Sequence, residues 1–210
     1  MDYTNLRKAM VESQLVARDI TDEKVIRAFN LVERYKFVPD EFKKNSYENH
    51  PLPIGDNQTI SQQYIVALMV QLLKLEGNEK VLEVGTGSGY ETAILCQIVK
   101  DVFTVECIDA LSRNAQKILN ETGYKNIHFK IGDGTQGWPQ EAPFDRIIVS
   151  AASSKVPEPL LDQLNDPGRL VIPVGDRFNQ NLIVINKEDG RLQTSNICGC
   201  SFVPLVGKYS

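Results

Sequence analysis

The feature that most constrains this chain is a strand-like apolar run that leads directly into three alternating glycines. Residues 81–90 are Val-Leu-Glu-Val-Gly-Thr-Gly-Ser-Gly-Tyr, and a helical pattern follows them. Glycine adopts positive φ angles easily and lets the backbone come close to a ligand. The order of strand, glycine turn and helix is typical of the first crossover in a doubly wound sheet, whose ligands bind beyond the carboxyl ends of the strands.

The residues after this turn alternate between short apolar segments and helical patterns. The segments predicted as strands are 81–84, 102–105, 127–130, 146–150 and 170–174, and those predicted as helices are 90–99, 111–121 and one that begins near Pro157 or Pro159. Strands separated by helices predict a parallel sheet with helices on both faces. We therefore expect an α/β fold with a doubly wound, mostly parallel sheet.

The two ends of the chain have different patterns. Residues 1–78 are predicted to hold helices and a substrate loop, with Thr21 and Ser61 as N-caps, the latter for a helix over 64–75. Residues 37–58 are predicted to form an extended loop. Residues 176–210 are β-rich, and their predicted strands are 182–185, 192–197 and 202–206. We expect a single domain over 1–210 with its ligand-binding core in 79–175, because the length suits one α/β domain.

Composition narrows the class of protein. The chain has 23 basic and 27 acidic residues, a formal net charge of −4, which argues against a broad basic face for nucleic acid. The apolar run at 65–70 is far shorter than the ~20 residues that span a bilayer, and the pattern of the first residues does not predict a secretory signal. The four cysteines lack the spacing of a metal site. We expect a cytoplasmic protein with reduced thiols, no metal, and neither nucleic acid nor membrane as partner.

The glycine spacing distinguishes between two ligands. A dinucleotide turn, GxGxxG, needs glycine at position 90, where this chain has Tyr90. The observed GxGxG, with Glu83 two residues ahead of it, suits S-adenosylmethionine, whose carboxylate can accept from free loop amides while an acid faces its ammonium side, directly or through water. The predicted contacts in this turn are Glu83, Gly85, Thr86, Gly87, Ser88 and Gly89. The alternative is a tight turn without a ligand.

Two more acids follow later strands in the positions where a nucleoside needs them. Glu106 comes 21 positions after Gly85 (106 − 85), close to the ~20 expected of the acid that pairs with ribose hydroxyls. Asp133, followed by Gly134, stands after the third strand, where its carboxylate could accept from an adenine amine. The alternatives are a solvated charge for Glu106 and an Asx-turn for Asp133.

The methyl acceptor must be inferred from what the sequence contains and lacks. Residues 150–153 are Ser-Ala-Ala-Ser, where enzymes that methylate amines commonly have Asp/Asn-Pro-Pro-aromatic, and neither His50 nor His128 lies in a catalytic motif. A carboxylate acceptor needs no base, since its pKa near ~4 leaves it ionised, and transfer then depends mainly on alignment. Thr59 and Ser61 are candidates for orienting it, although an N-cap explains Ser61 equally well.

Several segments together resemble the protein-L-isoaspartate (D-aspartate) O-methyltransferase family, over nearly the whole chain from about Lys36. The matching segments are 37–39, 51–55, 58–62 (Gln-Thr-Ile-Ser-Gln), 81–90, 132–134, 137–138, 142–145, 147–149, 170–175 and 202–206 (Phe-Val-Pro-Leu-Val). Many methyltransferases share the glycine turn, whereas residues 59–62 and 202–206 are specific to this family.

The resemblance implies a Rossmann-like class I methyltransferase that repairs damaged proteins. It would transfer a methyl group from S-adenosylmethionine to the α-carboxylate of L-isoaspartyl residues in proteins or peptides, and D-aspartyl residues would be a second acceptor. The ester would then collapse to a succinimide without further catalysis. By family analogy, Ser61 contacts that carboxylate, Thr59 lies nearby, and residues 51–61 and 202–206 line a groove for an extended peptide. A monomer is expected.

The chain departs from the family pattern at three places. Gln63 replaces the usual proline after Ser-Gln, Asp56 adds a negative charge near the expected anionic substrate, and residues 165–168 replace a glycine pair. Two other interpretations stay open on the residues alone. One is a methyltransferase of another acceptor such as RNA, and the other is a non-catalytic module that binds the cofactor.

Overall fold

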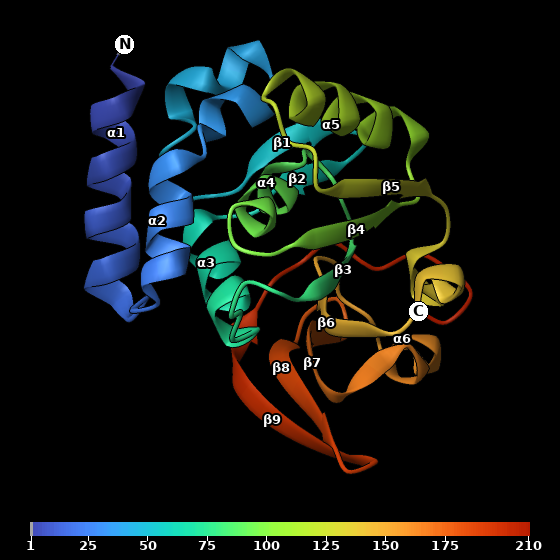
Figure 1. The fold of residues 1–210 in the computed structure, drawn as a ribbon. Helices are drawn as coiled ribbons and strands as arrows, with labels where there is room; N and C mark the ends of the chain where they lie inside the picture. Colours follow the sequence, from blue (N-terminus) through green and yellow to red (C-terminus); the bar gives the residue numbers. More distant parts are fainter. Residues whose placement is uncertain (1) are drawn as a thin grey trace.

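A seven-stranded sheet in the order β5-β4-β3-β6-β7-β8-β9 forms the centre of the computed structural model, which describes residues 2–210 (Figure 1). Its strands are β3 (Lys80–Val84), β4 (Asp101–Glu106), β5 (Ile127–Ile131), β6 (Phe144–Val149), β7 (Leu164–Gly175), β8 (Gln180–Glu188) and β9 (Arg191–Cys200). The strands from β5 to β7 are parallel, and β8 and β9 continue the sheet antiparallel. The predicted α/β class is confirmed.

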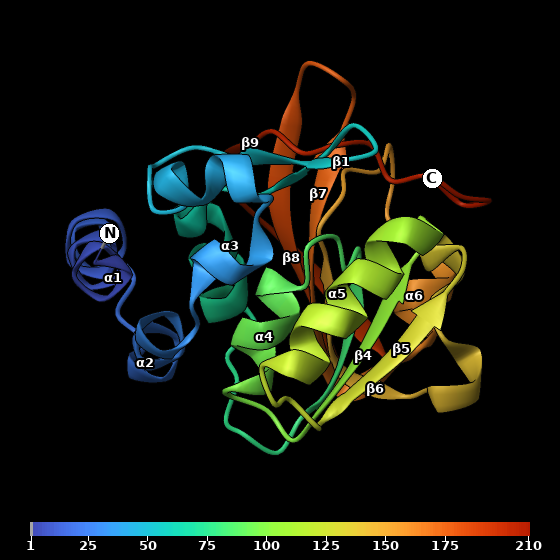
Figure 2. The same ribbon diagram turned by 90° about the horizontal axis from the view of Figure 1, so that it is seen from above.

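Helices cover both faces of the sheet (Figure 2). They are α1 (Tyr3–Met10), α2 (Glu23–Leu31), α3 (Gln63–Leu72), α4 (Tyr90–Cys96), α5 (Asp109–Glu121) and α6 (Glu158–Asp162). The helices α1 to α5 contribute to one apolar core, and α6 contributes Leu160 to the core on the opposite face. None of the helices in the described part of the chain is long and apolar enough to cross a membrane.

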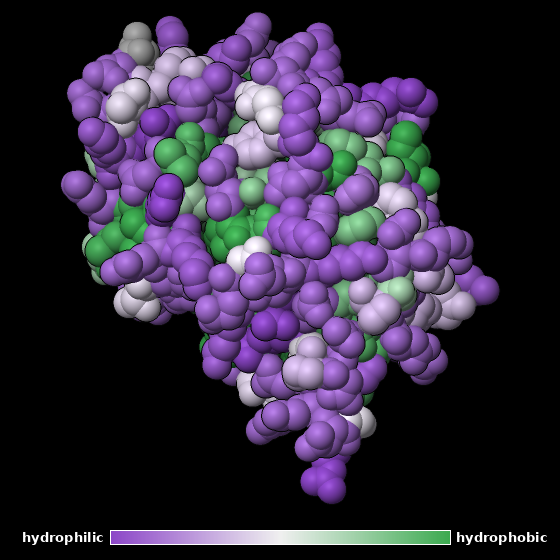
Figure 3. Space-filling view, viewed as in Figure 1, coloured by the Kyte–Doolittle hydropathy of each residue, from purple (hydrophilic) through white to green (hydrophobic). Residues whose placement is uncertain are grey.

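Strand alternation divides the sheet between these two cores. Val81 and Val102 belong to the core beneath α3, α4 and α5, whereas Leu82 and Phe103 belong to the core that contains α6. The central strands are buried on both faces, which is why they are nearly continuous apolar runs in the sequence. The face in Figure 3 is mainly hydrophilic, and its apolar side chains form small separate patches.

The N-terminal third differs from the prediction in three details. The side chain of Asp22, rather than Thr21, caps α2 by accepting from the amides of Lys24 and Val25. The segment 37–58, predicted as an extended loop, begins at the end of the 3₁₀ helix η3 (Arg34–Phe37) and contains a second one, η4 (Asp40–Asn45). It ends in the hairpin of β1 (Leu52–Gly55) and β2 (Gln58–Ile60). Its turn residues Asp56 and Asn57 have φ of 49° and 57°, the left-handed pair that a two-residue hairpin turn requires.

The third detail concerns Ser61, whose predicted N-cap role is wrong. The helix begins at Gln63, its N-cap position is Gln62, and no side chain caps it. The other short helical turns in the described residues are η1 (Val11–Leu15), η2 (Val16–Arg18), η5 (Gly134–Gln136) and η6 (Pro139–Glu141).

The C-terminal segment 202–206 is not the strand that its sequence predicts. The last strand ends at Cys200, and the segment pairs with the main chain only through the bridge between Pro204 and Ala152, with the Leu205 amide donating to the Ala152 carbonyl (2.7 Å). The segment crosses the carboxyl ends of the central strands, and the Lys208 amide donates to Asp133 at their far side (2.9 Å).

Candidate functional site

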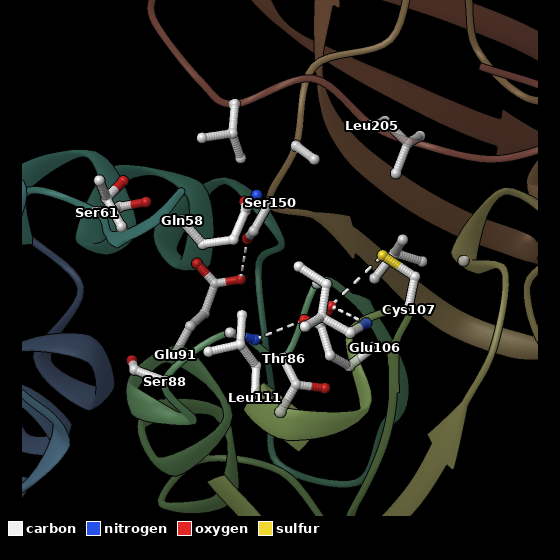
Figure 4. A pocket seen from close by; sticks show the side chains of 18 of the residues that line it. Gln58, Ser61, Thr86, Ser88, Glu91, Glu106, Cys107, Leu111, Ser150 and Leu205 are labelled. Carbon is white, nitrogen blue, oxygen red and sulfur yellow. Dashed lines mark hydrogen bonds between the residues drawn. The ribbon is translucent and has the colours of Figure 1, made fainter. Parts of the chain in front are cut away.

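A cavity open to solvent lies where the carboxyl ends of β3, β4 and β6 face the β1–β2 hairpin and the C-terminal segment (Figure 4). We call its two sides the glycine wall, made by residues 84–88 with Glu106 and Gly134, and the hairpin wall, made by residues 58–61 with 203–206. The other residues that line it are Val66, Tyr90, Glu91, Val105, Cys107, Ile108, Leu111, Ser150 and Ala151. This position agrees with the rule that ligands of open α/β sheets bind beyond the carboxyl ends of the strands.

The glycine turn presents its backbone to this cavity. Gly85, Gly87 and Gly89 have φ of 100°, 52° and 85°, so each has the conformation for which glycine is suited. Their amides are used internally, whereas those of Thr86 and Ser88 have no acceptor among the described residues. Amides of a turn before a helix that lack an acceptor suit an anionic group. Gly89 does not line the cavity but allows close packing, because a Cβ there would lie 3.0 Å from Leu119 Cδ1.

Glu106 closes the glycine wall at the end of β4. Its Oε2 accepts from the Gly87 amide (2.9 Å) and its Oε1 from the Ile108 amide (3.0 Å), so the carboxylate is held rigidly by backbone on both sides. A carboxylate accepts about four hydrogen bonds, which leaves room for ligand hydroxyls. The fold thus places Glu106 in the cavity lining, and its contact with ribose hydroxyls stays a prediction.

Gly134 lines the cavity, whereas Asp133 lies just behind it. Asp133 makes the Asx-turn considered above, since it accepts from the Thr135 amide (2.9 Å) and hydroxyl (2.6 Å) and also from the Lys208 amide. Burial alone would raise the pKa of Asp133, but these hydrogen bonds outweigh it and lower that pKa. A Cβ on Gly134 would lie only 2.5 Å from Val84 Cγ1, so the backbone here must come close to the sheet. Whether Asp133 also reaches an adenine amine stays a prediction.

Glu83 is not brought into the cavity. Strand alternation turns it toward α4, where its Oε2 accepts from the hydroxyls of Thr92 and Thr104 (both 2.6 Å), and it is fully buried. Burial and the neighbouring Glu91 raise its pKa well above the usual value. The Thr104 hydroxyl in turn contacts that of Thr86 (2.5 Å), so Glu83 supports the glycine turn from behind.

Glu91, instead of Glu83, is the acid of this region that lines the cavity. It stands in the first turn of α4, it is 8 % exposed, and its Oε1 accepts from the hydroxyl of Ser150 at the end of β6 (2.6 Å; Figure 4). Burial raises the pKa of Glu91 to about 7. No sequence signal distinguished Glu91, because an acid in the first turn of a helix is ordinarily explained by the helix dipole.

Ser61 and Thr59 both line the hairpin wall. The Ser61 side chain is half-buried, and its hydroxyl makes no hydrogen bond within residues 2–210. With the N-cap role removed, this hydroxyl is free for a ligand. Thr59 is exposed on β2, opposite Pro53 of β1.

A buried arginine that the sequence analysis missed holds Ser61 in place. Arg34 is fully buried; its Nε donates to the Ser46 carbonyl and a terminal nitrogen donates to the Ser61 carbonyl (both 2.8 Å). Its guanidinium lies 4.8 Å from the centre of the Tyr90 ring, and burial lowers the pKa of Arg34 to about 10. Gln63, the residue that departs from the family pattern, donates to the same Ser46 carbonyl (3.1 Å).

The cavity is acidic. Its lining contains the carboxylates of Glu91 and Glu106 and no lysine, arginine or histidine. His50 pairs with Glu48 on the surface, and His128 of β5 stacks on Phe103 of β4. Over residues 2–210, no three His, Cys, Asp or Glu side chains are grouped to hold a metal ion.

These residues fit S-adenosylmethionine. The free amides of Thr86 and Ser88 suit a carboxylate, Glu106 suits vicinal hydroxyls, and the apolar surface of Ile108 and Leu111 suits a flat base.

Comparison with known proteins agrees with this geometry. Residues 5–210 match the family model described as Protein-L-isoaspartate(D-aspartate) O-methyltransferase. The chain is 49% identical over 209 residues to Protein-L-isoaspartate O-methyltransferase 1 of Syntrophobacter fumaroxidans, covering 100% of this chain and 98% of that protein. It is 52% identical over 211 residues to the Protein-L-isoaspartate O-methyltransferase of Petrotoga mobilis, covering 100% and 99%.

Solved structures give the same result. A protein-L-isoaspartate O-methyltransferase aligns with a TM-score of 0.88 and 26% identity over 97% of this chain and 67% of its own. A Plasmodium falciparum protein, described as a protein-L-isoaspartate O-methyltransferase and crystallised with S-adenosyl-L-homocysteine, aligns with a TM-score of 0.83 and 25% identity over 95% of this chain and 98% of its own.

Proposed function

This chain belongs to the protein-L-isoaspartate(D-aspartate) O-methyltransferase family, and from that premise we propose how its residues methylate isoaspartyl groups in proteins. It is an S-adenosylmethionine-dependent methyltransferase. The bound donor supplies an electrophilic methyl group on a positively charged sulfur. The chain's own residues must therefore hold the donor, aim the acceptor and keep both in one cavity.

The glycine wall holds the donor. Thr86 and Ser88 bind its carboxylate through their amides, Gly85 and Gly87 let the backbone approach, and Glu106 accepts from the ribose hydroxyls. Gly134 and the turn of Asp133 border the adenine, and Gly89 and Glu83 keep the turn in shape from behind.

The hairpin wall positions the acceptor. The α-carboxylate of an isoaspartyl residue is ionised at neutral pH, so no residue needs to remove a proton from it. The Ser61 hydroxyl, with Thr59 beside it, donates a hydrogen bond that orients the carboxylate without neutralising it. Orientation of this kind is worth up to ~7–11 kcal/mol of a barrier. The observation that carries this assignment is the free Ser61 hydroxyl in a wall that faces the glycine turn.

The acidic lining and a net charge of −4 oppose the alternative of an RNA acceptor, because phosphates would meet carboxylates. We further propose a monomer in the cytoplasm, since one chain supplies every wall of the cavity. Light scattering after size-exclusion chromatography tests the monomer and should give the mass of one chain.

The test of the activity is methyl transfer from radiolabelled S-adenosylmethionine to paired peptides that differ only in isoaspartyl against aspartyl. We expect label on the isoaspartyl peptide alone. Equal labelling of both peptides would remove the specificity, and tight donor binding without transfer to any isoaspartyl peptide would favour a non-catalytic module. Labelled RNA would revive the alternative acceptor.

A further inference from the structure

Glu91 is a buried carboxylate without a positively charged partner. Its Oε1 accepts from Ser150, while its Oε2 accepts no hydrogen bond from residues 2–210 and belongs to the cavity lining. Glu83 lies behind it on β3, and no basic side chain lines the cavity. Taking a carboxylate out of water is costly unless a cation or several donors replace the water. The arrangement therefore calls for a cationic ligand group at this point of the wall.

The position of Glu91 along the cavity identifies which ligand group that is. In Figure 4, Glu106 and Cys107 lie at one end, and Glu91, Ser150 and Ser88 lie toward the end that holds Ser61. If Glu106 accepts from the ribose, the amino-acid part of the donor extends toward Ser88 and Glu91. The free amides of Thr86 and Ser88 then match its carboxylate, and the free oxygen of Glu91 matches its ammonium group.

We propose that Glu91 is the residue that binds the α-ammonium group of S-adenosylmethionine and of its product, S-adenosylhomocysteine. This inference rests on the proposed function. It assigns the ammonium contact to Glu91 instead of Glu83, which α4 and the two threonines separate from the cavity.

Ligand binding should also change the protonation of Glu91. The titratable group packed against Glu91 is Glu83 from β3, Glu106 from β4 lines the same cavity, and the adjacent Tyr90 of α4 has the Arg34 guanidinium over its ring. In the ligand-free protein, burial raises the pKa of Glu91 to about 7. An ammonium group beside it favours the ionised form, so binding near pH 6.5 should release a proton.

The experiment compares two ligands by calorimetry. S-adenosylhomocysteine has the amino-acid part, and 5′-methylthioadenosine has the same nucleoside without it. At pH 8 we expect Glu91→Gln to weaken the binding of S-adenosylhomocysteine about 10- to 100-fold, as for loss of a charged hydrogen bond. The affinity for methylthioadenosine should change less than about twofold. Glutamine can still accept from Ser150, so the fold should survive. Glu121→Gln, an exposed position on α5, is the matched control and should change neither affinity.

A second measurement needs no variant. For the wild-type protein at pH 6.5, binding enthalpies in buffers of different ionisation enthalpy should show proton release with S-adenosylhomocysteine and none with methylthioadenosine. The assignment would be overturned if Glu91→Gln weakened the binding of both ligands equally or of neither. It would also be overturned if the variant raised only the KM for the isoaspartyl peptide. Failure of the wild type to bind either ligand would instead reject the proposed function.

Discussion

The two walls of the cavity are built in different ways. The glycine wall comes from strand ends that are neighbours in the sheet, and its contacts are mainly backbone contacts such as the Gly87 amide with Glu106. The hairpin wall brings together residues 58–61 and 203–206, which are far apart in the chain and are held by Arg34 and by the bridge between Ala152 and Pro204.

This difference separates their tasks. A wall of backbone groups fixed by a parallel sheet suits a ligand that is always the same, namely the donor. A wall of side chains on a hairpin and an irregular segment suits an acceptor that is part of many different proteins. Changes in the glycine wall should therefore affect donor affinity, and changes in the hairpin wall should affect turnover and peptide affinity.

The largest effect is expected from Ser61→Ala. It removes the hydroxyl aimed at the acceptor while keeping the backbone carbonyl that Arg34 binds, so turnover on the isoaspartyl peptide should fall by about 10²–10³-fold. Affinity for S-adenosylhomocysteine should stay within about twofold, as measured by calorimetry. Ser13→Ala, at an exposed serine of η1, is the control. Weakened donor binding with normal turnover would show that Ser61 contacts the donor and not the acceptor.

The converse change is Glu106→Gln. Glutamine loses the negative charge that accepts from the amides of Gly87 and Ile108 and, as we propose, from the ribose. The Kd of S-adenosylhomocysteine should rise roughly 10-fold or more, with little change in the KM of the peptide. A variant that raised only the peptide KM would show that the two walls do not divide the tasks.

Glu91 lies between the walls and should make the ligand-free protein sensitive to pH. Its pKa is about 7 when folded and near the ordinary 4.5 when unfolded, so the folded state holds more protons between these values. The contribution of Glu91 to the free energy of unfolding is fully present below about pH 4.5 and is lost as the pH rises through 7. The Tm of wild type relative to Glu91→Gln should therefore fall between pH 5 and pH 8 in thermal melts, and saturating S-adenosylhomocysteine should reduce the difference. A constant difference would contradict the raised pKa.

The smallest effect is expected from Asp56→Asn at the hairpin turn. Asparagine also tolerates the left-handed conformation that residue 56 has, so the hairpin should keep its shape while one exposed negative charge disappears. The KM for an isoaspartyl peptide should fall by about twofold or less, and the effect should vanish at high salt. An effect as large as that of Ser61→Ala would show that Asp56 acts directly on the acceptor.

The glycine wall could be predicted from the sequence because its geometry is local. Three alternating glycines after an apolar strand require positive φ within a few residues, and the acid at 106 follows from the length of one crossover. The predicted strands and helices from residue 80 to residue 175 agree with the structure for the same reason, apart from their ends, such as α4 ending at Cys96.

The hairpin wall and the acid that faces the donor were decided by tertiary structure. Which glutamate reaches the cavity depends on the face that α4 covers, and this turns Glu83 inward and leaves Glu91 in the wall. No pattern in the sequence indicated that Arg34 would be buried against the Ser61 carbonyl, or that residues 202–206 would cross the strand ends without joining the sheet. Such contacts join segments distant in the chain, and spacing along the sequence carries no information about them.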